Sequence, residues 1–127
     1  PLDELLTRPI VVGWEIQDQW VGTSVVATSP RHPVVCEILD ITTTTALRAR
    51  PGTRPNRISG PKAVTAPLLR RRRTHGDVRI LDEHVWYPVR WDEPERSEAH
   101  HPDAWVVHHW AHQRALRGIP IPATSAT

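Results

Sequence analysis

The sequence predicts one domain in which strands and helices are mixed, of the α/β or α+β class. Its 127 residues are the length of a single domain, and a hydrophobic content of 39% suffices for one modest core. Apolar residues alternate over residues 10–15, as in a strand, whereas they recur at helical spacing after Ser29. Both signals within one unit of this size favour a mixed class over either pure class.

The composition excludes several kinds of protein. A single cysteine, Cys36, excludes an internal disulfide and a cysteine-based zinc site. The longest uncharged apolar stretch, residues 10–14, is far below the roughly 20 residues of a membrane-spanning helix, and no signal-peptide pattern is present. The net charge of +2 is too weak to indicate a specific nucleic-acid partner.

Strands are expected where β-branched residues dominate short runs. The first covers residues 10–15, and a second extended segment of ambiguous type covers residues 21–28. Three further short strands are predicted, over residues 78–81, 85–89 and 104–108.

Helices are expected between these runs. Residues 1–8 have the spacing of a short helical turn. Ser29 is expected to cap a helix that has Pro33 in its first turn and ends before Pro51-Gly52. After a loop over residues 53–59, a second helix covers residues 62–73, in which Pro67 predicts a kink or an early end. Residues 91–103 are predicted to form a loop.

The densest group of potential metal ligands is the run from Trp105 to Trp110, which contains His108 and His109 and is followed by His112. Neutral imidazole ligates divalent metals. Adjacent residues of a strand point to opposite faces, so only one of the paired histidines would face a given site. A packed or solvated histidine pair is the alternative, and no His-Glu-x-x-His pattern indicates a zinc hydrolase.

Two other features allow more than one interpretation. The four arginines from Arg70 to Arg73 could grip phosphates, or they could form a solvated helix end, because a helix spreads consecutive side chains around its axis. The six tryptophans could stack on sugars or bases, or serve as the aromatic core of a chain that has no Phe.

Taken in order, the short motifs of this sequence resemble one known family. They are Pro1-Leu2-Asp3-Glu4-Leu5-Leu6, Gly13-Trp14-Glu15, Ser29-Pro30-Arg31-His32-Pro33, Ser59-Gly60-Pro61, Val78-Arg79-Ile80-Leu81 with Trp86-Tyr87-Pro88-Val89-Arg90-Trp91, and Val107-His108-His109-Trp110. The order and gaps resemble the C-terminal half of the DXD-containing sugar transferases, which are related to yeast initiating mannosyltransferase and to bacterial capsular polysaccharide enzymes. The resemblance covers residues 1–114.

The resemblance implies a fold, a reaction and a cofactor. Members of the family have a GT-A fold, an α/β sandwich around a mainly parallel sheet, of which this chain would be the C-terminal portion, with a mixed sheet and flanking helices. They transfer a sugar, with retention, from a nucleotide-sugar donor to a saccharide, lipid or protein acceptor, using Mn²⁺ or Mg²⁺. Residues 1–116 would belong to the catalytic domain and residues 117–127 to a flexible tail. A cytoplasmic location is implied if the protein is bacterial.

The resemblance also assigns residues. His108 matches a metal or diphosphate ligand with Trp110 beside it, Gly60 and Pro61 match a loop that lines the substrate cleft, and Glu15 matches a catalytic acid. The structural alternatives are a plain helix start for Gly60-Pro61 and, for Glu15, a strand-end acid that binds backbone amides.

The sequence departs from the family in three places. The Asp-x-Asp metal motif, which in the family lies just before the stretch that resembles residues 1–6, does not occur. Gly22-Thr23 stands in place of paired Asn, and Gln113-Arg114 in place of Ser-Trp. We therefore expect this polypeptide alone neither to bind a nucleotide sugar tightly nor to turn it over. A catalytically inactive remnant and a polyanion-binding interaction module are the alternative functions.

Overall fold

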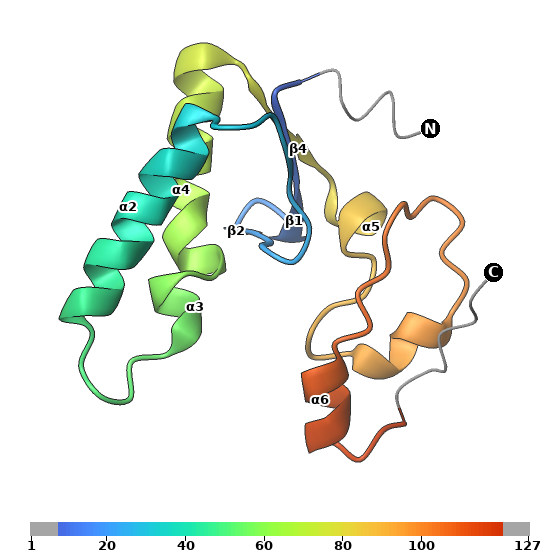
Figure 1. The fold of residues 1–127 in the computed structure, drawn as a ribbon. Coiled ribbons are helices and arrows are strands. Elements are labelled where there is room, and N and C mark those ends of the chain that lie inside the picture. Colours follow the sequence, from blue (N-terminus) through green and yellow to red (C-terminus); the bar gives the residue numbers. More distant parts are fainter. Residues whose placement is uncertain (1–7, 121–127) are drawn as a thin grey trace.

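The computed structural model describes residues 8–120, which fold around one small mixed sheet (Figure 1). Its central strand is β1 (Ile10–Ile16). β4 (Val78–Leu81) pairs with β1 in parallel, and β3 (Ala27–Thr28) pairs with it antiparallel on the opposite edge. β2 (Trp20–Val21) pairs antiparallel with the end of β1, across an irregularity between Trp14 and Ile16.

Helices and irregular chain cover the two faces of this sheet. α2 (Pro33–Arg48) and α4 (Pro61–His75) form a layer on one face, and the single turn α3 (Pro55–Ile58) joins them. On the other side lie α5 (Glu83–Trp86), the 3₁₀ turn η1 (Pro94–Glu98) and α6 (Ala111–Leu116). The fold is therefore mixed α/β, as predicted, although β1 and β4 form its only parallel pair in the described region.

The alternation in β1 divides the core between the two faces. Ile10, Val12 and Trp14 pack with apolar residues of α2 and α4, whereas Val11 packs with Trp86 and Tyr87. Side chains alternate between the faces of a strand. The strand predicted for residues 10–15 is therefore confirmed, and the structure shows that both of its faces are packed.

α2 begins where Pro33 was expected, but its cap is not Ser29. The Nδ1 atom of His32 accepts a hydrogen bond from the Val34 amide at 3.3 Å, whereas the Ser29 amide bonds to the Pro9 carbonyl at 2.7 Å. Ser29 therefore continues the antiparallel pairing of β3 with β1. The helix then continues through its threonines and ends before Pro51-Gly52, as predicted.

α4 contains Pro67 without ending there, so the prediction of an early end is wrong. Proline has no amide hydrogen and removes one helical hydrogen bond. Pro67 is buried, and Val64 and Leu68 on the same helix pack in the core against the sheet. This packing holds the helix together until Gly76, whose φ of 66° provides the left-handed cap.

Three other expectations about local structure are wrong. Residues 53–59 are not all loop, because α3 lies within them. Residues 85–89 form the end of α5 and irregular chain, and residues 104–108 form no strand. The latter segment lies over α5, where the Trp105 amide donates to the Val85 carbonyl at 2.9 Å, and its Val106 packs against the core without a neighbouring strand.

The two ends of the chain limit two further expectations. The helical turn predicted at residues 1–8 falls almost wholly outside the described residues. Of the predicted tail, residues 117–120 are described and are bonded to the rest, since Arg117 donates to the Asp92 carbonyl at 2.8 Å. No helix in the described part of the chain has the length and apolar content needed to cross a membrane.

Candidate functional site

A pocket of about 250 Å³ lies at the end of β1. It is lined by Glu15, Ile16, Trp20, Asn56, Pro61, Lys62 and Trp91, and we call it the strand-end pocket. The sheet, α3 and the start of α4 supply all of these residues except Trp91, which comes from the segment after α5. The pocket brings together Glu15 and Pro61, which the sequence placed in two separate motifs.

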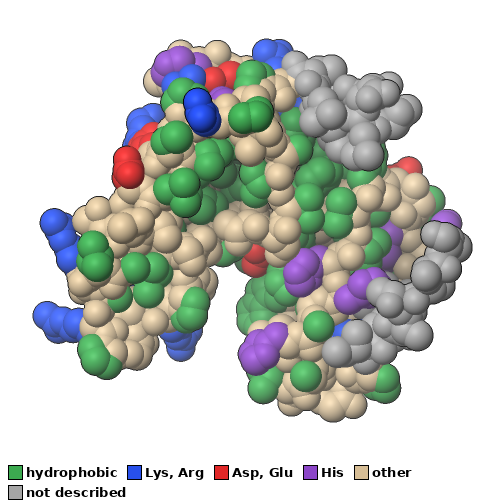
Figure 2. All heavy atoms as spheres, in the orientation of Figure 1, with side chains coloured by type: hydrophobic (Ala, Val, Ile, Leu, Met, Phe, Trp, Pro, Cys, Tyr) green, Lys and Arg blue, Asp and Glu red, His purple; other side chains and the backbone are tan. Residues whose placement is uncertain are grey.

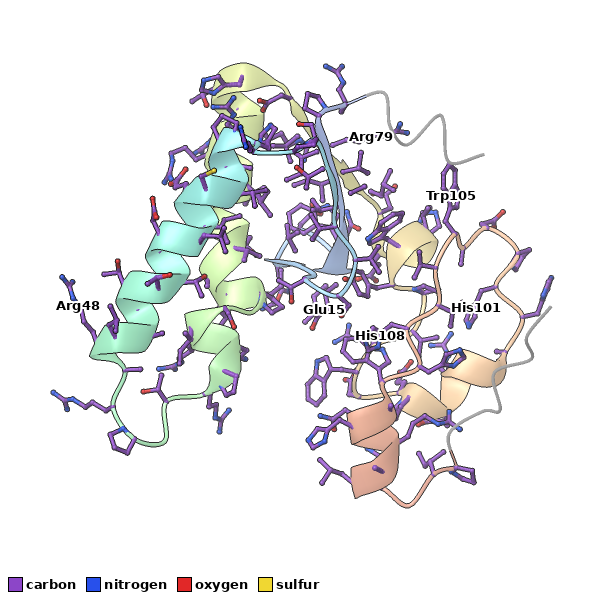
Figure 3. The ribbon with its side chains drawn as sticks, viewed as in Figure 1. Glu15, Arg48, Arg79, His101, Trp105 and His108 are labelled. Atoms are coloured by element: carbon purple, nitrogen blue, oxygen red, sulfur yellow. The ribbon has the colours of Figure 1, made fainter. Side chains whose placement is uncertain are left out.

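The region around the pocket is visibly hollowed. Figure 2 shows a notch between the helix layer and the C-terminal segment, with an acidic side chain at its head and histidines on its C-terminal wall. In Figure 3, Glu15 and His108 lie near this notch, whereas Arg79 lies toward the opposite end of the sheet.

Glu15 is a partly buried carboxyl group. Burial raises its pKa above the ordinary value of 4.5, because a carboxylate loses hydration in such a place. Within residues 8–120, no backbone amide donates to its carboxylate, so the alternative of an acid bound to backbone amides has no support there. A carboxylate with a raised pKa is a better proton acceptor near neutral pH.

Tyr87 is a buried residue with a phenol group. Burial is the main cause of its raised pKa and the charge of Glu15 adds slightly to it, whereas hydrogen bonds from Val25 and Ser24 act in the opposite direction. Its hydroxyl oxygen accepts hydrogen bonds from the amides of Ser24 at 3.0 Å and Val25 at 3.2 Å. Gly22 makes this possible, because a Cβ there would lie 2.4 Å from the tyrosine ring.

His108 and Trp110 complete an aromatic group with Tyr87. The His108 and Trp110 ring centroids are 4.2 Å apart, and each lies 6.4 Å from the Tyr87 centroid. The Trp110 indole nitrogen donates to the Val89 carbonyl at 2.7 Å. His109 is exposed. Only one of the paired histidines thus faces the interior, as expected, although the segment is not a strand.

The hydrogen bond of the His108 ring decides what this residue can do. Its Nδ1 atom accepts from the Trp110 amide at 3.0 Å, so in the neutral ring the proton must be on Nε2. Burial, and to a smaller extent the charge of His109, lowers the pKa of His108, which favours this neutral form. Nε2 is therefore a donor. A donor suits an anionic oxygen, whereas a metal would need the lone pair of that nitrogen.

The described residues do not fit a divalent metal. No three His, Cys, Asp or Glu side chains within residues 8–120 come close enough together to hold an ion. Mn²⁺ and Mg²⁺ prefer several oxygen ligands. The Nε2–H of His108 is a hydrogen-bond donor, which suits an oxygen atom of a ligand and not a metal ion.

Gly60 does not line the strand-end pocket, but it shapes it. A Cβ at this position would lie 2.6 Å from the Cα atom of Asn56 in the preceding turn. Gly60 therefore lets α3 pack directly against the start of α4, and so places Asn56 and Pro61 in one wall. Gly60 thus positions the pocket wall and does not line the pocket. The sequence motif alone could not separate these two roles.

Two of the four consecutive arginines pair with carboxylates on different elements. Arg70 pairs with Glu37 on α2, and Arg71 binds Asp77 through two nitrogens at 2.7–3.1 Å. Arg72 lines another hollow, of about 480 Å³, together with Arg8 and Arg79. The helix thus spreads these side chains, as expected, and Arg71 is a structural residue.

The sequence did not single out Tyr87, Trp20, Asn56, Lys62 or Trp91 as functional residues. Two of them, Tyr87 and Trp91, lie in a motif that carries the family resemblance, and that motif was the available signal. Asn56 and Lys62 reach the site only through the packing of α3 and α4, and Trp20 lies on β2 beside the end of β1. Comparison of the chain with protein families, curated proteins and solved structures finds no match.

Proposed function

We propose that this chain is part of a glycosyltransferase that moves a sugar from a nucleotide-sugar donor to an acceptor hydroxyl. The observation that supports this most is that Glu15 and His108 both lie near the notch between the helix layer and the C-terminal segment (Figure 3), although His108 does not line the strand-end pocket. Glu15, with its raised pKa, can accept a proton, and the half-buried His108 offers a fixed N–H donor. These are the two kinds of group that glycosyl transfer needs at its two ends.

In the proposed reaction, the Glu15 carboxylate accepts the proton of the acceptor hydroxyl. The acceptor oxygen forms a bond to the anomeric carbon on the face from which the diphosphate leaves, as retention requires. The bond from that carbon to the diphosphate oxygen breaks, and the electron pair leaves with the diphosphate. The His108 Nε2–H donates a hydrogen bond to this leaving oxygen. No step depends on a metal, since the described residues alone do not fit one. The implied Mn²⁺ or Mg²⁺ would require ligands beyond them.

The test measures sugar transfer and donor hydrolysis by the full-length natural polypeptide that carries this sequence. Labelled UDP- and GDP-sugars are supplied across a Mn²⁺ and Mg²⁺ titration. His108→Ala is expected to lower kcat by about 10² to 10³, as loss of one preorganised charge-stabilising donor does. His109→Ala is the matched control, because this exposed neighbour should leave kcat unchanged.

Two results would contradict the proposal. If the wild-type protein neither transfers nor hydrolyses any donor, the enzyme assignment is wrong and an inactive remnant is favoured. If transfer occurs but His109→Ala is the inactive variant, the role of His108 is wrong. Melting curves of both variants separate a catalytic loss from unfolding.

A second candidate function has one supporting observation, the hollow between Arg8, Arg72 and Arg79. The exposed guanidinium of Arg72, with Arg8 on the same hollow, favours polyanions through charge. Arg72→Gln should then lower the salt concentration at which the protein elutes from heparin, whereas Arg48→Gln, at the distant end of α2, should not. Equal elution of the two variants would remove this candidate.

A further inference from the structure

We infer that the strand-end pocket binds one sugar ring of a saccharide acceptor, with Trp91 as the stacking surface and Asn56 and Lys62 as hydrogen-bonding groups. That this sugar is the acceptor rests on the proposed glycosyltransferase function. Binding of a sugar ring is a property of the pocket itself, and it can be measured without any donor.

Trp91 supplies the open aromatic surface. Its side chain is 42% exposed although it forms one wall of the pocket. A large aromatic group left open beside a hollow is a common mark of a binding site. One face of a pyranose ring carries C–H groups with a slight positive charge, and the face of an indole is negative. The two surfaces therefore attract each other and together lose contact with water.

Trp20 on the opposite side has a different role. The Lys62 ammonium lies 5.3 Å from the centroid of a Trp20 ring, in the range of a cation–π contact. This contact covers part of the Trp20 face and holds the ammonium at the pocket wall. Trp91 is therefore the ring available for stacking, and Lys62 is a positioned donor.

The polar groups of the pocket match hydroxyl groups. Lys62 only donates hydrogen bonds, an ionised Glu15 only accepts them, and the Asn56 amide does both. Sugar hydroxyls donate and accept, so each of these groups can find a partner. The acceptor hydroxyl that reacts would be the one next to Glu15.

Size and charge favour an acceptor sugar over the donor. The volume of about 250 Å³ lies below the roughly 300–1,000 Å³ of pockets that hold drug-sized ligands, so it suits a single ring better than a nucleotide sugar. The lining has one carboxylate and one ammonium, which gives no excess of positive charge for a diphosphate.

The test uses ¹⁹F NMR of the 127-residue chain labelled with 5-fluorotryptophan. The six tryptophans give separate signals that single Trp→Phe variants assign. The probes are the methyl α-glycosides of mannose, glucose and galactose, with glycerol as the polyol control. At least one glycoside is expected to shift the Trp91 and Trp20 signals with a millimolar Kd, while the other four signals stay in place.

The variants identify the stacking ring. Trp91→Ala should abolish the saccharide shift of the Trp20 signal, and Trp91→Phe, which keeps a smaller ring, should weaken binding several-fold. Trp105→Ala is the matched control, because Trp105 is 40% exposed and lies outside the lining of the pocket. Melting curves check each variant, and Trp91→Phe carries the test if Trp91→Ala does not fold.

Three outcomes would overturn the inference. They are no Trp91 shift with any glycoside, an equal shift of the Trp105 signal, and a Trp91 shift with UDP, GDP or inorganic phosphate but with no sugar. If glycosides bind as expected while the full-length protein shows no transfer, the pocket stands and the proposed enzyme function fails. If the full-length protein transfers sugar but no glycoside binds in this pocket, the proposed enzyme function stands and the inference about the pocket fails.

Discussion

Glu15 lies in a place that lowers the stability of the fold at neutral pH. Its pKa is raised by burial, so the folded state binds the proton more tightly than the unfolded state does. As the pH rises through the ordinary value of 4.5 toward the raised folded value, this contribution to stability is lost. A carboxylate kept where it costs stability is typical of functional sites.

We therefore expect Glu15→Gln to raise the melting temperature at pH 7 and to leave it nearly unchanged at about pH 3.5, where the wild-type carboxyl is already protonated. Thermal melts across this pH range measure the effect. Asp40→Asn, at an exposed position of α2, should show no such gain at pH 7. A loss of stability at pH 7 in Glu15→Gln would mean that the carboxylate has a stabilising partner.

Gly22 is required because the Tyr87 ring takes the space of a side chain. Gly22→Ala should destabilise the protein by roughly 1–3 kcal/mol, as overpacking of a core does. Tyr87 is the only tyrosine, so an ultraviolet pH titration follows its phenol directly. Displacement of the ring should bring its raised pKa back toward 10.0.

Gly52→Ala serves as a comparison with a different cause. Gly52 has a φ of 84° and no atom near the added Cβ, so only backbone strain of about 1–2 kcal/mol is expected. The tyrosine titration should not change in this variant. If both variants shift the titration equally, the close approach of Tyr87 to Gly22 is not the cause.

At the scale of elements, Asp77 joins the start of α2, the end of α4 and the start of β4. Arg71 binds its carboxylate, and His32 Nε2 lies 3.3 Å from Asp77 Oδ2. The hydrogen bond from Arg71 is the main reason that the pKa of Asp77 is lowered from 3.8. The stability that this provides is complete above pH 3.8 and is lost as the pH falls through the lower, folded value.

Asp77→Asn should accordingly cost about 1 kcal/mol at neutral pH, a moderate value because the pair is partly exposed. It should also flatten the loss of stability in acid. Glu37→Gln breaks the more exposed pair with Arg70 and should change stability by less than about 0.5 kcal/mol. Urea unfolding at several pH values compares the two, and equal losses would show that Asp77 is an ordinary surface charge.

At the scale of the whole molecule, Arg114 holds the C-terminal segment together. It is fully buried and donates to the carbonyls of Pro94 and Pro120, which connects α6 to η1. Residues 89–120 of this segment contain few regular elements and no strand, so the hydrogen bonds of Arg114 hold its parts together in place of backbone hydrogen bonds between strands. Removing a buried donor leaves such carbonyls unsatisfied, at about 1–3 kcal/mol each.

Arg114→Met is therefore expected to remove hydrogen-exchange protection from residues 89–120 while β1 and α4 keep theirs. Local opening of one cooperative unit would produce this pattern. Arg117→Met is the matched control, since Arg117 is exposed and its guanidinium contacts the Asp92 carbonyl and, at 3.8 Å, the exposed Glu95 carboxylate. Simultaneous loss of protection in β1 would show that the two regions unfold as one.

The sequence by itself determined the elements whose hydrophobic spacing agrees with their packing. Residues 10–15 alternate, and both faces of β1 are buried, so pattern and structure coincide. The helix after Pro33 and the cap at Gly76 were also predictable, because proline restricts the backbone to a helical φ and glycine permits the left-handed conformation. Glu15 and Pro61 were named as site residues, but their motifs lie far apart in the chain.

Only the tertiary structure decided where the remaining side chains meet. Residues 104–108 have the composition of a strand but lie over α5, where the Trp105 amide donates to the Val85 carbonyl and not to a strand. Trp91 and Lys62 face one pocket through the packing of distant segments, which no local pattern encodes. The position of the proton on the His108 ring likewise depends on the hydrogen bond from the Trp110 amide. Trp110 itself has a left-handed backbone conformation, with a φ of 50°. Local preference acts over a few residues, whereas a site depends on contacts between segments that only the folded chain brings together.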